Sequence, residues 1–135
     1  MKGGTFVFDS NIWISFILNK KFHKLINIII DNNLKVFISD EMLYEIENVL
    51  KRPKFSKYIN DNEINEAIII ISKVSVIFND YKTVRLTRDI KDDYIIVLAK
   101  ATKTKFVVTG DKDLLEYKHT PSPSIINLSQ FMIGI

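Results

Sequence analysis

The stretch Thr5-Phe6-Val7-Phe8-Asp9-Ser10-Asn11 joins a short apolar run to an acid and then to two residues that often begin helices. A short run of apolar and β-branched residues is typical of a buried strand. Serine and asparagine favour helix starts because their side chains accept hydrogen bonds from free backbone N–H groups. We therefore predict a strand over residues 5–9 and a helix from residue 10, with a carboxylate at the junction.

The rest of the chain repeats this alternation of strand-like and helix-like segments. Further strands are predicted over residues 34–38, 74–78, 105–109 and 124–127. Further helices are predicted over residues 21–32, 40–50, 61–73, 92–101 and 111–117, with polar connections over 79–89 and 119–123. Because helices separate successive strands, the pattern predicts an α/β fold with a largely parallel sheet.

Length and composition limit the possible architectures. A chain of 135 residues with 47% hydrophobic residues, without repeats or linkers, predicts a single domain over residues 1–135. There is no cysteine and there are only two histidines, so a metal would be held by oxygen atoms. No apolar run approaches the roughly 20 residues of a membrane span, and no secretory signal is recognisable, so we expect a cytoplasmic protein. The net charge of +3 is compatible with a polyanionic partner but is only a mild excess.

Acidic residues recur where α/β proteins bind ligands, just past the carboxyl ends of strands. Asp9 ends the first predicted strand, and Asp111 follows the strand over 105–109. Asp92 and Asp93 lie at the start of a helix whose apolar residues must pack on the sheet. Glu45 lies one turn into the helix after the second strand, at the edge of its apolar stripe. We therefore expect these carboxylates to meet at one edge of the sheet.

Clustered carboxylates repel one another, so such a group is costly unless a cation neutralises it. Mg²⁺ and Mn²⁺ prefer oxygen ligands. A cation of this kind can activate water and stabilise the charge that develops on a phosphodiester. The constellation therefore indicates nuclease chemistry.

Each acid also has an ordinary structural explanation when it is taken alone. Asp9 could cap the helix that follows it, and Asp92 and Asp93 are common types of residue for a first helical turn. Glu45 could lie on a solvated helix face, and Asp111 fits a turn or a helix cap. Their joint placement favours the functional explanation.

Four segments, in this order, resemble the PIN-domain family. Phe8–Trp13 resembles the family's opening of aspartate, serine or threonine, and asparagine. Ser39–Phe55 resembles an element of the VapC-like ribonuclease branch, the toxin components of toxin–antitoxin systems. Arg88–Asp93 is similar to a family motif that usually has proline where this chain has Ile90, and Val107–Leu115 matches the family's Val-Thr-Gly-Asp ending. The resemblance covers nearly the whole chain.

The resemblance implies a PIN-like fold, with a mainly parallel central sheet of about four or five strands flanked by helices on both sides. It also implies roles for individual residues. The implied active-site acids are Asp9, Glu45, Asp92 and Asp111, of which Asp9, Asp92 and Asp111 would bind the metal. The implied supporting or ligand-orienting residues are Asp93, Asp113, Asn11 and Thr109. Whether Asp92 or Asp93 faces the metal stays open.

The resulting hypothesis is a Mg²⁺-dependent or Mn²⁺-dependent endoribonuclease that is the toxin of a prokaryotic type II toxin–antitoxin pair. Its implied partners are an RNA substrate, a cognate antitoxin and a second copy of the chain in a homodimer. One alternative is a catalytically silent PIN fold that only binds RNA or an antitoxin. Another is an aspartate-based phosphotransferase, but Asn11 stands where a haloacid-dehalogenase phosphatase needs a second aspartate, and the order of acids does not suit a receiver domain. No P-loop motif is present.

A few other residues are candidates for contact with RNA or with a partner. The segment 51–58 is basic with interleaved aromatic residues, so it could contact phosphates and stack a base, or could be a solvated helix end. Arg85 and Arg88 precede the acidic helix and could approach RNA or pair with an acid. The two histidines have no partner at metal-binding spacing, and Trp13 suits a core or a dimer contact.

Overall fold

The computed structural model describes residues 3–82, 90–117 and 123–134, and for residues 90–93 it describes the backbone alone. The predicted connections over 79–89 and 119–123 therefore lie largely outside the described residues. Within them the chain forms the predicted alternation of strands and helices. Among the described helices, none combines the length and apolar character needed to cross a bilayer.

The five described strands form one parallel sheet. They are β1 (Thr5–Phe8), β2 (Lys35–Ile38), β3 (Ser75–Ile77), β4 (Phe106–Val108) and β5 (Ser124–Ile126). Their order is β3-β2-β1-β4-β5, and all four pairings of neighbouring strands are parallel. The prediction of an α/β fold with a mainly parallel sheet is confirmed, and β1 occupies the centre of the sheet.

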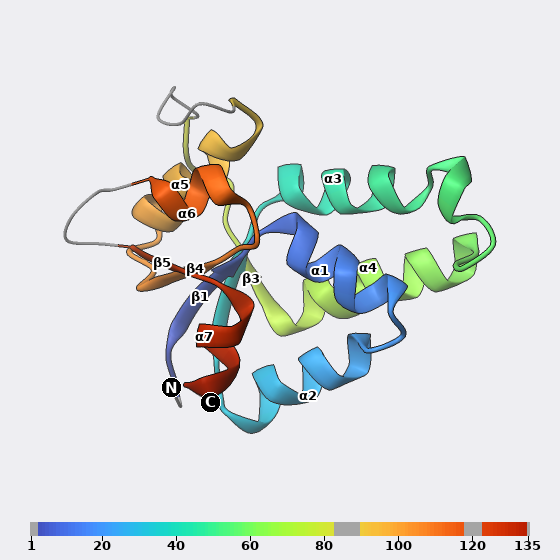
Figure 1. Cartoon of the computed structure of the whole chain (residues 1–135), viewed down its shortest axis with the longest axis horizontal. Coiled ribbons are helices and arrows are strands. Elements are labelled where there is room, and N and C mark those ends of the chain that lie inside the picture. The colour runs from blue at the N-terminus through green and yellow to red at the C-terminus, as the bar shows by residue number, and fades with distance from the viewer. Residues whose placement is uncertain (1–2, 83–89, 118–122, 135) are drawn as a thin grey trace.

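Helices cover both sides of this sheet. They are α1 (Ser10–Leu18), α2 (Phe22–Asp31), α3 (Asp40–Leu50), α4 (Asp61–Val74), α5 (Ile90–Ala101), α6 (Lys112–Glu116) and α7 (Leu128–Ile133), with a 3₁₀ turn at Pro53–Phe55. Figure 1 shows α1 to α4 grouped on one side of the strands, and α5 and α6 on the other. Helix α5 begins two residues earlier than predicted, and Asp92 and Asp93 lie within its first turn.

The C-terminal helix α7 was not predicted from the sequence. Its start is marked by a capping box, in which Asn127 and Gln130 each accept a hydrogen bond from the other's backbone N–H. The ring of Phe131 packs edge-on against Phe6 and Phe8, with 5.2 Å between ring centroids in both pairs. Helix α7 therefore completes the core beneath the central strand, and its six residues were too few for a clear helical period.

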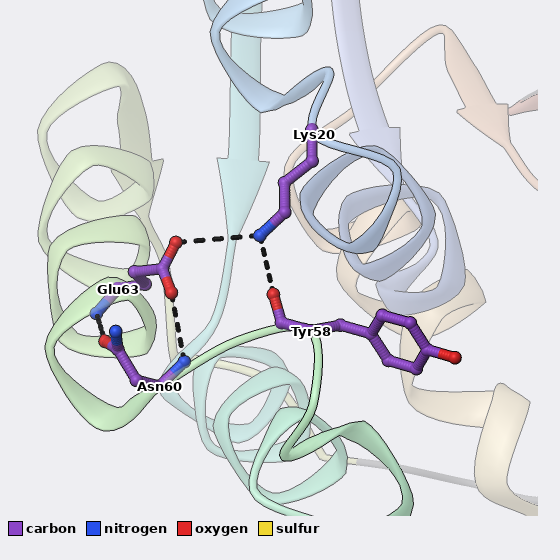
Figure 2. Close-up of polar contacts among 4 residues, drawn as sticks. All are labelled: Lys20, Tyr58, Asn60 and Glu63. Atoms are coloured by element: carbon purple, nitrogen blue, oxygen red, sulfur yellow. Dashed lines mark hydrogen bonds and ion pairs between the residues drawn. The ribbon is translucent and has the colours of Figure 1, made fainter.

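Lys20 links the helix pair α1–α2 to the helix pair α3–α4 on one side of the sheet (Figure 2). Lys20, in the turn between α1 and α2, has a positive φ of 60°. Its Nζ donates to the backbone carbonyl of Tyr58 at 2.6 Å and lies 3.6 Å from the Glu63 carboxylate. Glu63 also belongs to the capping box that begins α4 with Asn60. Through these contacts Lys20 links the α1–α2 turn to the connection between α3 and α4 and to the start of α4.

We predict that Phe131→Ala lowers the free energy of unfolding by about 3–5 kcal/mol, because it empties a fully buried ring site. Ile133, in the same helix, is 84% exposed, so Ile133→Ala should change it by less than about 0.5 kcal/mol. Urea denaturation followed by circular dichroism measures both. Equal effects of the two substitutions would show that α7 is not packed as described.

Candidate active site

The sheet order creates a topological switch point beside β1. From β1 the chain adds β2 and β3 on one side, and then crosses through α5 to place β4 on the other side. Because the strands are parallel, all carboxyl ends lie on one edge, and the connections after β1 and β4 leave in opposite directions. Ligands of α/β proteins bind in the crevice that forms at such a point.

Two of the sequence-predicted acids are joined at this switch point through a threonine. The Thr109 hydroxyl donates to Asp9 Oδ2 at 2.7 Å, across 100 residues of chain. The same hydroxyl oxygen accepts the backbone N–H of Asp111 at 3.0 Å. Asp9 is 2% exposed and Thr109 is fully buried, so this hydrogen-bonded pair is shielded from solvent at the carboxyl ends of β1 and β4.

Asp9 and Asp111 also cap helices, as the structural explanation of each acid suggested. Asp9 Oδ1 accepts the backbone N–H of Asn11 and the hydroxyl of Ser10, both at 3.3 Å. Asp111 Oδ1 accepts the backbone N–H of Asp113 at 2.7 Å. In both residues capping engages Oδ1, so capping does not exclude a second role for the carboxylate. Asn11 contributes its backbone here, while its side chain is exposed.

Burial raises the pKa of Asp9 above its ordinary value of 3.8. Hydrogen bonds from Thr109, Asn11 and Ser10 oppose this rise, and the negative charge of Asp111 adds to it. The Thr109 hydroxyl contacts both residues and so keeps Asp111 close to the Asp9 carboxylate. A positive ion beside them would relieve both the repulsion and the cost of burying the Asp9 charge.

Glu45 is half-buried on α3, as its position at the edge of the apolar stripe suggested. Its Oε1 accepts a short hydrogen bond from the hydroxyl of Tyr94 on α5. Tyr94 is 5% exposed, and burial, followed by the bond to Glu45 and the charges of Glu45, Asp9 and Glu41, raises its pKa strongly. The tyrosine hydroxyl therefore stays protonated and lies within the electrostatic reach of Asp9.

A second tyrosine fixes the start of α3. The Tyr81 hydroxyl lies 2.9 Å from Ser39 Oγ and 2.8 Å from Glu41 Oε1, to which it donates. Burial first, and then the bond to Glu41, raises the pKa of Tyr81 to about 12. Asn79 and Asp40 make two further hydrogen bonds, of 2.8 and 2.9 Å, between the same segments. The chain that follows β3 is thus attached to the N-terminus of α3.

Asp92 and Asp93 lie on the first turns of α5, which packs against β1, β2 and β4. The side chains of both residues lie outside the described part of the structure. Among the side chains that are described, no three acidic, histidine or cysteine residues lie close enough together to hold one ion.

The basic segment 51–58 makes local contacts within the described residues. Lys51 lies 3.5 Å from the Glu47 carboxylate one turn earlier, and Lys54 lies over the Phe55 ring at 5.1 Å from its centroid. These contacts fit a solvated helix end, and contact with RNA stays a prediction. Trp13 is fully buried, so it belongs to the core. Arg85, Arg88 and His119 lie outside the described residues.

A surface cavity of about 270 Å³ opens elsewhere, between the α1–α2 turn and α4. Its lining includes Ile17, His23 and Ala67, and none of the candidate acids is among its lining residues. The candidate active site is therefore separate from this cavity.

Sequence reasoning missed Tyr94 and the bridging role of Thr109. Tyr94 directly follows the acidic pair 92–93, and its polar hydroxyl at an otherwise apolar helix position was the available signal. The expected role of Thr109, to orient a ligand by hydrogen bonds, stays a prediction. In the structure its hydroxyl donates to the Asp9 carboxylate and accepts the backbone N–H of Asp111, so it orients the Asp9 carboxylate and the Asp111 backbone.

The raised pKa of Asp9 predicts a specific pH dependence of stability. The folded chain holds the Asp9 proton more tightly than the unfolded chain, so the free energy of unfolding falls as pH rises from about 4 through the raised pKa. Asp9→Asn has no proton to lose. In EDTA, the stability of wild type relative to Asp9→Asn should therefore decline over this range, by about 1.4 kcal/mol for each unit of the shift.

Urea denaturation of both proteins at a series of pH values measures this difference. A difference between wild type and Asp9→Asn that stays constant with pH would contradict the burial of a titrating carboxylate at this position.

The chain is similar to known proteins. The chain is 32% identical over 115 residues to MJ1680 of Methanocaldococcus jannaschii, an uncharacterized protein; the match covers 83% of this chain and 74% of the relative. A profile of the PIN domain matches residues 5–113, which include the sheet up to β4 and all of the candidate acids. The chain therefore belongs to the PIN domain family.

Proposed function

We propose that this chain is a Mg²⁺-dependent or Mn²⁺-dependent endoribonuclease, whose active site is formed by Asp9, Glu45, Asp92 and Asp111. PIN domains are generally nucleases and typically bind divalent metals, and the family suggests RNA as the bound polymer. The chain's membership of the family supports a nuclease-type fold, while the acids and their arrangement support the assignment of the site.

The observation that carries this proposal is the hydrogen-bonded series Asp9–Thr109–Asp111 at the switch point of the sheet. It brings the ends of β1 and β4 together and holds a nearly fully buried carboxylate beside a second one. Folding has to overcome the cost of burying this charge, and no described basic side chain makes an ion pair with Asp9. A bound cation is the natural compensation.

The available donors fit a hard divalent cation. They are carboxylate oxygens from different elements, and the chain has no cysteine that would favour a softer metal. We propose Asp9, Asp92 and Asp111 as the residues that would bind the ion, with Glu45 as the fourth acid. When bound, Mg²⁺ would activate water and stabilise the charge that develops on the phosphodiester.

The remaining residues act on these acids. Thr109 holds Oδ2 of Asp9 in place, and the backbone of Asn11 holds Oδ1, so the Asp9 carboxylate cannot rotate freely. Asp113 donates its backbone N–H to Asp111 and fixes that carboxylate in the same way. Asp93 is proposed as a further support of the site, because it follows Asp92 in the first turns of α5. Pre-oriented oxygen ligands favour cation binding because little conformational freedom is then lost.

The biological role that we propose is that of the toxin in a prokaryotic type II toxin–antitoxin pair. The support for this role is the resemblance of segment 39–55 to the VapC-like branch, which spans α3 and the 3₁₀ turn after it. A cognate antitoxin and a homodimer belong to the same proposal, as does a cytoplasmic location.

The test is cleavage of a mixed RNA pool by wild type, Asp9→Asn and Asp31→Asn, each with Mg²⁺, with Mn²⁺ and with EDTA. Asp31 is an exposed acid at the end of α2, so Asp31→Asn controls for the loss of one negative charge. We expect wild type and Asp31→Asn to cut RNA with either metal and not with EDTA. Asp9→Asn should cut at least about 100-fold more slowly, because it removes a metal ligand.

Metal-dependent cleavage by Asp9→Asn at the wild-type rate would refute the site assignment. Wild type that binds Mn²⁺ and RNA without cutting would instead establish the alternative, a PIN fold that binds without catalysis.

A further inference from the structure

Helix α3 carries two glutamates, Glu41 and Glu45, that are one turn apart and accept hydrogen bonds from different tyrosines. Tyr81, from the segment after β3, donates to Glu41. Tyr94, from the first turns of α5, donates to Glu45. The two pairs share the same chemistry, but they differ in burial and in distance from the candidate active site.

The Tyr94–Glu45 pair is the more deeply buried of the two. Tyr94 is 5% exposed, and the residues that follow it, Ile95 and Ile96, are buried where α5 packs against the central strands. Glu41, in contrast, is exposed on the outer part of the first turn of α3. The position of the Tyr94 hydroxyl is therefore set by the core of the protein, which lets it hold Glu45 in one orientation.

The hydrogen bond from Tyr94 also determines which Glu45 oxygen stays available to bind a cation. A glutamate on a helix has three rotatable side-chain bonds and normally samples several rotamers in water. Tyr94 engages Oε1 alone in the described contacts, which leaves Oε2 for a cation. Helix α3 begins just past the carboxyl end of β2, the parallel neighbour of β1, and α5 packs on β1, so the Tyr94–Glu45 pair lies between elements that start at the same edge of the sheet as Asp9.

We propose that Tyr94 is a positioning residue, whose hydroxyl fixes the Glu45 carboxylate so that Glu45 contributes to divalent-cation binding at the acidic site. This inference rests on the proposed function, because it takes the acidic site to be a metal site. It adds a residue that neither the acidic motifs nor the family match assigns. Tyr81 has no such role and secures only the start of α3.

The experiment measures Mn²⁺ binding by isothermal titration calorimetry, so its readout does not depend on cleavage. The variants are Tyr94→Phe, Glu45→Gln and their double mutant. The matched control is Tyr81→Phe, which likewise removes a tyrosine hydroxyl that donates to a glutamate of α3. Thermal melting shows whether each variant is folded at the temperature of titration.

We expect Tyr94→Phe to raise the dissociation constant for Mn²⁺ about tenfold, as loss of a residue that orients a metal ligand does. Tyr81→Phe should leave it within about twofold of wild type. Because Tyr94 acts through Glu45, adding Tyr94→Phe to Glu45→Gln should cause little further loss. A merely structural contribution would add in full to that of Glu45→Gln.

Three results would overturn the inference while leaving the metal site standing: unchanged Mn²⁺ affinity in Tyr94→Phe, equal losses in Tyr94→Phe and Tyr81→Phe, or a loss from Tyr94→Phe that adds in full to that of Glu45→Gln. Wild type that binds no Mn²⁺ would overturn the inference and the proposed function together, so the two failures are distinguishable.

Discussion

The hydrogen bond from Thr109 to Asp9 is the interaction on which the rest of the site depends. Asp9 ends the central strand and is nearly fully buried, and a carboxylate in that position is costly unless polar groups surround it. Thr109 supplies one donor from the neighbouring strand, and the start of α1 supplies two more. These bonds tie the sheet, helix α1 and the turn before α6 to one carboxylate. The desolvation that remains raises the pKa of Asp9 and makes the position receptive to a cation.

The parallel sheet explains why acids so distant in sequence are neighbours. Strands β1 and β4 are adjacent and parallel, so the residues that follow them emerge at the same edge, although 100 residues separate Asp9 from Thr109. Helix α5 crosses the sheet between β3 and β4 and carries Tyr94 to the Glu45 carboxylate on α3. The elements on the two sides of the sheet are thus connected through the site.

Much of the fold was predictable because its elements have strong local signals. Apolar runs marked the strands, and Ser10 and Asn11 marked the start of a helix that the structure confirms. Helix α7 was missed because six residues show no clear period, and its contacts with Phe6 and Phe8 are non-local. For the site, strand ends predicted that Asp9 and Asp111 would lie at one edge, where Thr109 joins them. The sequence could not predict that Tyr94 would reach Glu45, because this contact depends on how α5 and α3 are placed across the sheet. The roles of the acids in metal binding and catalysis stay predictions.

The position of a bound ion shows directly whether a divalent cation binds between the carboxyl ends of β1 and β4. Crystals of the wild-type protein grown with Mn²⁺ would reveal the ion by its anomalous scattering. We predict a peak at coordination distance, about 2.0–2.2 Å, from carboxylate oxygens of both Asp9 and Asp111, and no peak there in crystals of Asp9→Asn. An ordered Mn²⁺ bound elsewhere, with the Asp9 carboxylate contacting only Thr109, Ser10 and the backbone of Asn11, would contradict it.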